Sequence, residues 1–404
     1  MALVQGRMEF PGADGHTLAA RVDLPALEPK AFALFAHCFS CSKDLKAAQR
    51  IAHRLTEAGF GVVRFDFTGL GQSEGDFANT NFSTNVQDLV AAANWMVSAG
   101  APPRLLIGHS LGGAAVITAA SEIASVRAVA TVGAPSDAEH VIHNFGEHID
   151  EIETRGEAEV RLAGRPFTIR KQFLEDVRGA KVRDAASALR KPLLVLHSPV
   201  DDTVGIENAT GLFLAARHPK SFVSLDGADH LLSREKDAEY AADVIAGWAN
   251  RYVFTDAPGE QPGITVSETR RGSKFENAVK IDGHTLLSDE PATIGGRDGG
   301  PDPYELVTAG LGACTSMTLR MYADRKGWPL ERVSVALSHE KTHAEDCAHC
   351  EEGRKVDVFE RRIAVEGPLS EEQRQKLLEI ADKCPVHRTL EEPVLIRTSL
   401  SAET

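Results

Sequence analysis

A serine at position 110 lies in a pattern that can make it a nucleophile. The apolar run Arg104–Ile107 leads into the five residues Gly108–Gly112, which read G-x-S-x-G, and small residues follow them. A strand, a sharp turn and a helix in this order hold a serine on a corner where glycines leave room beside it. The free N–H groups at the helix start then face the developing oxyanion. The pattern therefore predicts covalent catalysis by Ser110.

A serine hydroxyl is a poor nucleophile unless a base, oriented by a carboxylate, removes its proton. Sites of this kind deliver the three groups in the order serine, carboxylate, histidine, from the ends of successive strands. The run Leu193–Leu196 is followed by Asp201 and Asp202, and the run Phe222–Leu225 is followed by His230. The order predicts His230 as the base and either aspartate as the carboxylate.

Cysteine side chains offer a second kind of chemistry near the other end of the chain. Cys314 lies within a helix predicted to begin near Pro303, and Cys384 ends the helix predicted over Glu371–Lys383. The apolar positions of that second helix, Cys384 among them, follow an i, i+3, i+4, i+7 spacing. Cysteine is often a small buried hydrophobic residue, and the spacing alone favours that interpretation.

A third group combines a C-x-x-C motif with nearby histidines, and its members are His339, His343, Cys347, His349 and Cys350. Such a group can bind zinc or cycle between dithiol and disulfide. Acidic residues flank it, and no second C-x-x-C completes a tetrahedral set, so an exposed polar loop is favoured. We therefore predict no metal and no cofactor for this chain.

The elements that must position the serine form an alternating series. Short apolar runs alternate with helical stretches up to about Tyr252, which predicts a doubly wound, mostly parallel sheet. The acid-rich stretch 137–190 interrupts the series with a mostly helical pattern, so we expect a cap over the sheet. The predicted strands are Ala31–Ala36, Gly61–Phe65, Arg104–Ile107, Ala128–Val132, Leu193–Leu196 and Phe222–Leu225, and the predicted helices are Leu45–Ala58, Val86–Ala99 and Gly112–Ala120.

Residues 255–263 hold two prolines and two glycines without periodicity, which is typical of a linker. They divide the chain into a first domain, 1–254, and a second, 264–404. In the second domain strands are grouped around two helices, which predicts an α+β domain. Its predicted strands are Ile264–Thr269, Ala278–Ile281, Val333–His339, Ile363–Val365 and Val394–Thr398.

Bulk properties narrow the functional classes. A chain of 404 residues is too long for a single hydrophobic core, so two domains are expected. Its formal net charge of −14 argues against nucleic acid as a partner. No apolar run approaches the ~20 residues that cross a membrane, and the N-terminus lacks a signal-peptide pattern. We expect a cytoplasmic protein without a membrane partner, whose six cysteines remain reduced.

Motifs of the first domain resemble those of α/β hydrolases of the esterase and serine aminopeptidase type, over about residues 10–252. Phe65–Gly75 is similar to their D-x-x-G-x-G-x-S loop. His197–Val204 fits their H-G-x-x-D-x-x-V register, which implies Asp201 as the carboxylate and leaves Asp202 to cap a turn. The resemblance implies a small-molecule acyl ester or a related compound as the substrate.

The same resemblance implies that the backbone N–H groups of Phe39 and Leu111 are the oxyanion donors. The loop that carries Phe39 departs from the family, because His37-Cys38-Phe39 stands where His-Gly-x is usual. A cysteine in place of glycine tightens the loop beside the serine.

Motifs of the second domain resemble the OsmC/Ohr family, over about residues 264–400. The motifs are Asp289-Glu290-Pro291, Pro303-Tyr304-Glu305-Leu306, Gly312-Ala313-Cys314-Thr315 and Cys384-Pro385-Val386-His387-Arg388-Thr389-Leu390. In that family the first cysteine attacks an organic hydroperoxide and the second resolves the sulfenic acid into a disulfide, which a dithiol then reduces. The resemblance implies these roles for Cys314 and Cys384.

It also implies that Glu305 helps to organise the cysteine site, and it leaves Arg270 and Arg271 as candidates for an arginine partner. The family fold is an intertwined homodimer, which implies dimerisation through the second domain. Three hypotheses follow: an acyl hydrolase with an attached OsmC-like module, a thiol peroxidase with an auxiliary hydrolase, or a hydrolase whose second half serves for dimerisation.

Overall fold

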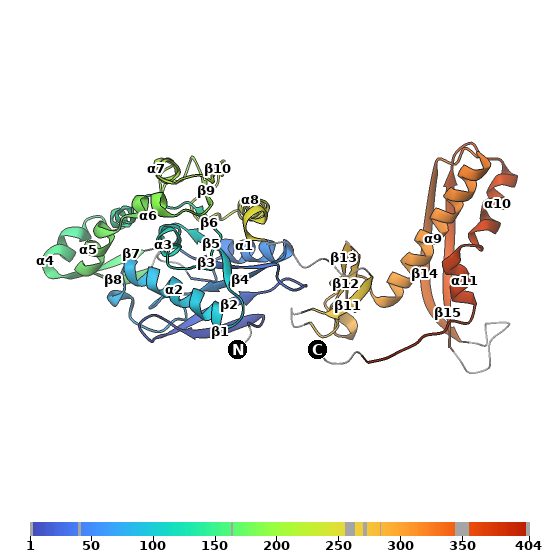
Figure 1. Cartoon of the computed structure of the whole chain (residues 1–404), viewed down its shortest axis with the longest axis horizontal. Coiled ribbons are helices and arrows are strands. Elements are labelled where there is room, and N and C mark those ends of the chain that lie inside the picture. The colour runs from blue at the N-terminus through green and yellow to red at the C-terminus, as the bar shows by residue number, and fades with distance from the viewer. Residues whose placement is uncertain are drawn as a thin grey trace. The chain divides into compact units, whose positions relative to one another are not determined.

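The computed structural model describes residues 3–38, 42–162, 165–254, 263–269, 273–282, 284–343 and 355–400. The chain divides into two compact units, one formed by 1–273 with 280–284 and the other by 274–279 with 285–404. Figure 1 shows the elements of both units with their labels. Among the described residues, no helix combines the length and the apolar character needed to span a membrane.

An eight-stranded sheet forms the centre of the first unit, in the order β1-β2-β4-β3-β5-β6-β9-β10. The first three strands in this order pair antiparallel, and the others pair parallel. The strands are β1 (Gly6–Pro11), β2 (Thr17–Asp23), β3 (Ala31–Ala36), β4 (Phe60–Phe65), β5 (Pro103–His109), β6 (Ala128–Val132), β9 (Leu193–His197) and β10 (Lys220–Ser224). The doubly wound, mostly parallel fold predicted from the sequence is confirmed.

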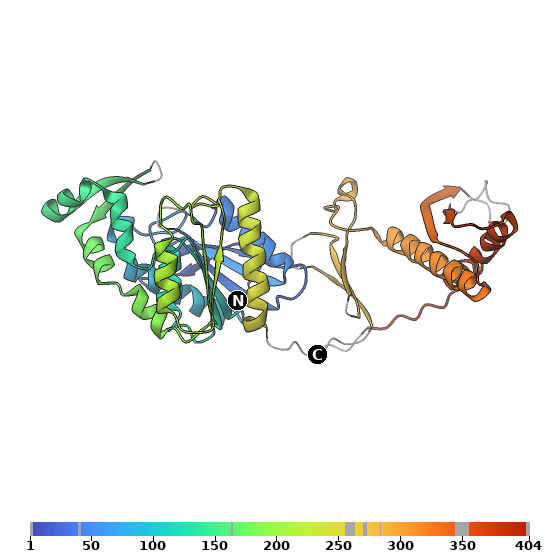
Figure 2. The same ribbon diagram turned by 90° about the horizontal axis from the view of Figure 1, so that it is seen from above.

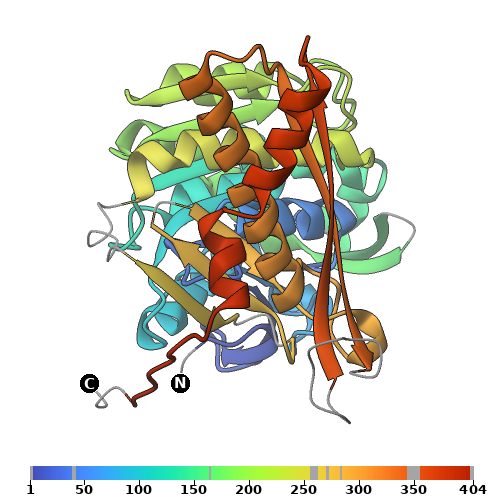
Figure 3. The same cartoon turned by 90° about the vertical axis from the view of Figure 1, so that its right-hand side faces the viewer.

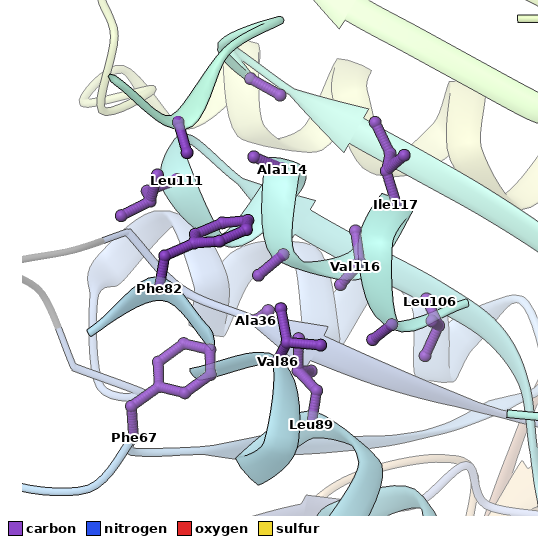
Figure 4. Packing of buried hydrophobic residues seen from close by; sticks show 14 of the residues in the cluster. Ala36, Phe67, Phe82, Val86, Leu89, Leu106, Leu111, Ala114, Val116 and Ile117 are labelled. Carbon is purple, nitrogen blue, oxygen red and sulfur yellow. The ribbon is translucent and has the colours of Figure 1, made fainter. Parts of the chain in front are cut away.

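Helices cover both faces of this sheet because its inner strands are apolar on both sides (Figure 2). In β3, Ala33 and Phe35 pack with α1 (Lys46–Glu57) and α8 (Glu235–Val253), whereas Leu34 and Ala36 pack with α2 (Phe82–Ser98) and α3 (Leu111–Ala119). This alternation follows the two-residue period of a strand. Figure 4 shows the packing on the face covered by α2 and α3, where Leu111 and Ala114 of α3 lie near Phe82 of α2.

The stretch between β6 and β9 contains the predicted insertion, but it is less helical than expected. Its elements are η2 (Ala138–Phe145), α4 (His148–Arg155), β7 (Glu157–Leu162), β8 (Arg165–Arg170), α5 (Lys171–Gly179) and α6 (Val182–Ala188). The strands β7 and β8 form an antiparallel pair. Alternate residues of β7 are buried, so a two-residue period was present in the sequence of a segment expected to be helical. After β9, α7 (Glu207–Ala215) leads to β10.

The C-terminal part contains a three-stranded sheet, in the order β11-β12-β13, followed by helices and a long antiparallel ribbon. Helix α9 packs against β14 and α10, and Figure 3 shows these elements side by side. The elements are β11 (Ile264–Glu268), β12 (Asn277–Ile281), β13 (His284–Ser288), α9 (Pro303–Lys326), β14 (Arg332–His343), β15 (Lys355–Glu366), α10 (Glu371–Ala381) and α11 (Pro385–Glu391). This is the α+β arrangement that the sequence predicted.

One predicted strand is wrong. Residues 394–398 form no strand, and the apolar side chains of Val394, Leu395 and Ile396 are 60%, 77% and 82% exposed. A strand exists only where a neighbour supplies ladder hydrogen bonds, and no described strand lies beside this segment. The apolar composition suggested a strand, but composition does not show whether a neighbouring strand is available for pairing.

Candidate active sites

The turn between β5 and α3 holds Ser110 in a strained conformation, with φ of 55° and ψ of −128°. Its N–H donates to the Val132 carbonyl at 2.9 Å, and its own carbonyl accepts from Gly113 at 2.8 Å. A side chain at Gly108 would lie 2.4 Å from the Gly112 carbonyl oxygen. The first and last residues of the G-x-S-x-G pattern therefore allow strand and helix to meet tightly at the serine.

Three side chains from the ends of different elements meet at this turn. Ser110 Oγ lies 2.9 Å from His230 Nε2, and His230 Nδ1 lies 2.8 Å from Asp201 Oδ2. The side chains of Asp201 and His230 are 2% and 8% exposed. The geometry suits transfer of the serine proton to an imidazole that a buried carboxylate orients.

The two candidate aspartates have different surroundings. Burial alone would raise the pKa of Asp201, but hydrogen bonds from His230, Val204 and Thr203 outweigh it and lower the pKa. Asp202 is exposed, and its carboxylate accepts only from the Thr203 hydroxyl among the hydrogen bonds of the described residues. The structure brings Asp201, not Asp202, to the histidine.

Three further histidines surround this group, and sequence reasoning assigned them no role. Burial lowers the pKa values of His37 and His197, and it lowers the pKa of His109 to about 4. His109 Nε2 lies 2.7 Å from the His230 carbonyl oxygen, so this ring fixes the backbone that carries His230. His197 Nε2 lies 2.7 Å from the Val204 carbonyl oxygen, in the turn that contains Asp201. Their only sequence signal was their position beside the motif residues.

The loop that follows β3 approaches the nucleophile turn closely. A side chain at Gly112 would lie 2.4 Å from the His37 carbonyl oxygen. The predicted donor Leu111 is the first residue of α3, where a backbone N–H has no acceptor within its own helix. The other predicted donor, Phe39, lies outside the described residues.

A buried ion pair anchors the far end of the same loop. Lys43 and Asp66 are 1% and 0% exposed, and the Lys43 ammonium donates to Asp66 Oδ2 at 2.7 Å. The Lys43 backbone N–H donates to Asp66 Oδ1 at 2.6 Å, and Gln72 accepts from the ammonium at 2.9 Å. Asp66 belongs to the D-x-x-G-x-G-x-S loop, so this motif serves to hold a neighbouring loop in place.

In the second unit, Cys384 is fully buried at the start of α11. The His387 N–H donates to its sulfur at 3.3 Å, and the Thr315 hydroxyl lies 3.7 Å away. That hydroxyl accepts from Arg361 Nη1 at 2.8 Å. Arg361, on β15, thus brings a positive charge toward the cysteine through one hydroxyl, and sequence reasoning did not identify it.

Cys314 immediately precedes Thr315 on α9 and is partly exposed, and both cysteines are free thiols. Glu305 stands at the start of the same helix in a capping box with Asp302, where its carboxylate accepts from the Asp302 N–H at 2.9 Å. Its carboxylate is therefore engaged in holding the helix start.

Several predicted residues lie outside the described part of the chain: Arg270, Arg271, Cys347, His349 and Cys350. Of the histidines near that C-x-x-C motif, His339 lies 2.8 Å from the Asp357 carboxylate and stacks on Tyr304. Within the described ranges, no three His, Cys, Asp or Glu side chains are grouped as metal ligands would be.

Comparison with known proteins agrees with this architecture. The model of the family described as serine aminopeptidase, S33 matches residues 28–154, and the model described as OsmC-like protein matches residues 296–399. The first unit therefore has the fold of an α/β hydrolase. One chain thus carries both matches, which is the fusion of an α/β hydrolase with an OsmC-like domain that the sequence predicted, and its first unit is similar to an esterase domain.

Several known proteins are similar to the hydrolase half of the chain. The esterase domain of a Rhodothermus marinus protein is 54% identical, with a TM-score of 0.52, and the match covers 61% of this chain and 98% of that one. Est1E from Butyrivibrio proteoclasticus, at 18% identity and a TM-score of 0.53 over 61% of this chain and 98% of its own, shows the fold alone. Mouse monoglyceride lipase is 28% identical over 255 residues, which are 55% of this chain and 82% of the lipase. An uncharacterized Salmonella typhi protein, YfhR, is 20% identical over 50% of this chain and 65% of its own length.

The difference between the two aspartates gives a first prediction. Asp201→Asn should lower kcat for ester hydrolysis by ~10⁴, because an amide favours the wrong imidazole tautomer. Asp202→Asn is the matched control and should stay within about threefold of wild type, since an exposed carboxylate is screened by solvent. Steady-state kinetics on a p-nitrophenyl ester measure both, and a larger loss in Asp202→Asn would contradict the assignment.

Proposed function

We propose that the first unit is a serine esterase in which Ser110 is the nucleophile, His230 the base and Asp201 the orienting carboxylate. The continuous hydrogen-bonded chain from Ser110 Oγ through the imidazole to Asp201 Oδ2 carries this proposal. The strained turn and the free N–H groups at the start of α3 support it.

In the proposed reaction His230 takes the proton as Ser110 Oγ attacks the ester carbonyl. The tetrahedral oxyanion receives hydrogen bonds from the Leu111 N–H and from the Phe39 N–H. His230 then protonates the leaving alcohol, and an acyl-enzyme remains. Water, deprotonated by His230, releases the acid and restores the serine.

The substrate class that we propose is a small-molecule acyl ester or a close analogue. The stretch between β6 and β9 adds six elements to the α/β core, and inserted segments of this kind shape substrate selection in a fold whose chemistry is fixed elsewhere.

For the second unit we propose thiol-dependent reduction of organic hydroperoxides. The Cys314 thiolate would attack the peroxide, release an alcohol and become a sulfenic acid. The Cys384 thiol would displace water from that acid to form a disulfide, and a dithiol reductant would restore both thiols. Contacts of Cys384 with the His387 N–H and the Thr315 hydroxyl, which Arg361 reaches, support a site that favours thiolate chemistry.

We also propose that the OsmC-like half pairs with a second copy of the chain. On α9 the side chains of Val307, Met317 and Met321 are 42%, 65% and 71% exposed, and the apolar segment 394–396 is exposed as well. Exposed apolar groups in such number on one helix are typical of an interaction surface. A homodimer would bury them.

Removal of the nucleophile tests the esterase proposal. Ser110→Ala should lower turnover of p-nitrophenyl esters by ~10⁴ or more and abolish labelling by a fluorophosphonate probe. Ser121→Ala, which changes an exposed serine just beyond α3, is the matched control and should keep both. Retained turnover in Ser110→Ala, with an unchanged circular dichroism spectrum, would refute the assignment.

The cysteine proposal has its own test. One equivalent of cumene hydroperoxide should consume the thiols of Cys314 and Cys384, and Cys384→Ser should leave a sulfenic acid on Cys314 that dimedone labels. Peptide mapping by mass spectrometry measures both outcomes. Oxidation confined to Cys347 and Cys350 would show that the cysteine pair is inert.

The dimer proposal is tested by charge. Met321→Glu should shift the mass measured by light scattering from that of a dimer toward that of a monomer, because it places a carboxylate in an apolar interface. Lys326→Glu, at the end of the same helix, is the control and should leave the mass unchanged. A monomeric wild-type chain would contradict the proposal.

A further inference from the structure

The insertion between β6 and β9 makes a direct contact with the turn that holds Asp201. His140, in η2, donates from Nε2 to the Thr203 carbonyl oxygen at 2.8 Å, since a carbonyl oxygen can only accept. The two residues lie 63 positions apart in the chain, so only the fold brings them together. The reaction proposed for Ser110 gives this half-buried histidine no role.

The contact continues into the catalytic group through a single peptide unit. The Thr203 carbonyl and the Val204 N–H belong to the same planar peptide and point to opposite sides of the chain. That N–H donates to Asp201 Oδ1 at 2.8 Å. The other carboxylate oxygen, Oδ2, lies 2.8 Å from Nδ1 of His230, whose Nε2 lies 2.9 Å from Ser110 Oγ. A continuous series of hydrogen bonds therefore joins the insertion to the nucleophile.

The middle of this series is shielded from water, because Val204 and the side chain of Asp201 are buried. In such surroundings a hydrogen bond accepted by a peptide oxygen polarises the peptide and makes its N–H a stronger donor. Burial alone would raise the pKa of Asp201, and the Val204 N–H is one of the donors, after His230, that lower it. A stronger donor at this position favours the ionised carboxylate, which is the form that orients the imidazole.

Contacts within the insertion fix the direction of the His140 ring. Asp137 caps η2 by accepting from the Glu139 N–H at 3.1 Å, which sets the start of the turn that carries the histidine. The ring of His143 packs edge-on against the His140 ring, with centroids 5.2 Å apart, and His143 Nδ1 donates to the His140 carbonyl at 3.1 Å. The insertion thus holds the imidazole in place toward the Thr203 carbonyl.

We propose that His140 is a positioning residue of the hydrolase, through which the insertion aligns the Asp201 carboxylate with His230. The proposal rests on the esterase function of Ser110. It gives the insertion a part in the chemical step, in addition to substrate selection. Because His140 acts on the carboxylate and not on the ester, its removal should change kcat and leave KM nearly unchanged.

Substitutions of the histidine measure the role of its donor. His140→Phe keeps a ring and removes the donor, and it should lower kcat for a p-nitrophenyl ester about two- to tenfold, the worth of one hydrogen bond, with KM within about twofold. His140→Gln places an amide N–H near the position of Nε2 and should restore at least about half of the wild-type kcat. His140→Asn carries the same amide one methylene short and should be as slow as His140→Phe.

Two controls separate this effect from a loss of fold. His148→Phe makes the same change on α4, where the histidine lies 3.8 Å from Glu151, and it should leave both kinetic constants unchanged. Each kcat is referred to the concentration of sites that a fluorophosphonate probe labels, so an unfolded fraction does not count as lost catalysis. If His140→Phe does not fold, the comparison of His140→Gln with His140→Asn still decides the outcome.

A double-mutant cycle tests whether the effect passes through Asp201. In an Asp201→Asn chain, His140→Phe should lower kcat by less than about twofold more, because the carboxylate that His140 aligns is gone. Wild-type kcat in His140→Phe and His140→Asn, equal losses in His140→Gln and His140→Asn, or an undiminished effect in the Asp201→Asn chain would each overturn the proposal. Failure of the esterase proposal is distinct, because Ser110→Ala would then retain turnover.

Discussion

A backbone contact too close for any side chain sets the geometry of the hydrolase. A Cβ added at Gly112 would lie 2.4 Å from the His37 carbonyl oxygen, and a Cβ added at Gly108 would lie 2.4 Å from the Gly112 carbonyl oxygen. These contacts bring the end of β3, the end of β5 and the start of α3 to one point. A residue with positive φ such as Ser110 costs ~1–3 kcal/mol, and the buried apolar face of α3 offsets that cost. The positions of the Ser110 hydroxyl and of the Leu111 N–H depend on this corner.

Around that corner, burial determines which groups carry charge. Burial lowers the pKa values of His109, His37 and His197, whereas hydrogen bonds lower the pKa of Asp201 despite its burial. The buried Asp201 carboxylate faces Nδ1 of His230, and Nε2 of the same imidazole faces Ser110 Oγ. His109 and His197 hold the two loops in place: His109 contacts the backbone of His230, and His197 contacts the backbone of the turn that holds Asp201.

The described cysteines of the two halves are in different states. Cys38 is in a disulfide, so the expectation that all six cysteines remain reduced is wrong, whereas Cys314 and Cys384 of the OsmC-like half are free thiols.

The sequence by itself determined the alternating order of strands and helices and the G-x-S-x-G turn, because these depend on neighbours in the chain. Chain order narrowed the carboxylate to Asp201 and Asp202, and the resemblance to α/β hydrolases favoured Asp201. Only the tertiary structure placed Asp201 against His230 and left Asp202 in solvent, since adjacent residues point in different directions. Only the fold could bring Arg361 to Thr315, Lys43 to Asp66 and the strands β7 and β8 together. Only the fold could show that residues 394–398 pair with no strand in the described part of the chain. Those outcomes depend on contacts between distant segments, which local pattern does not encode.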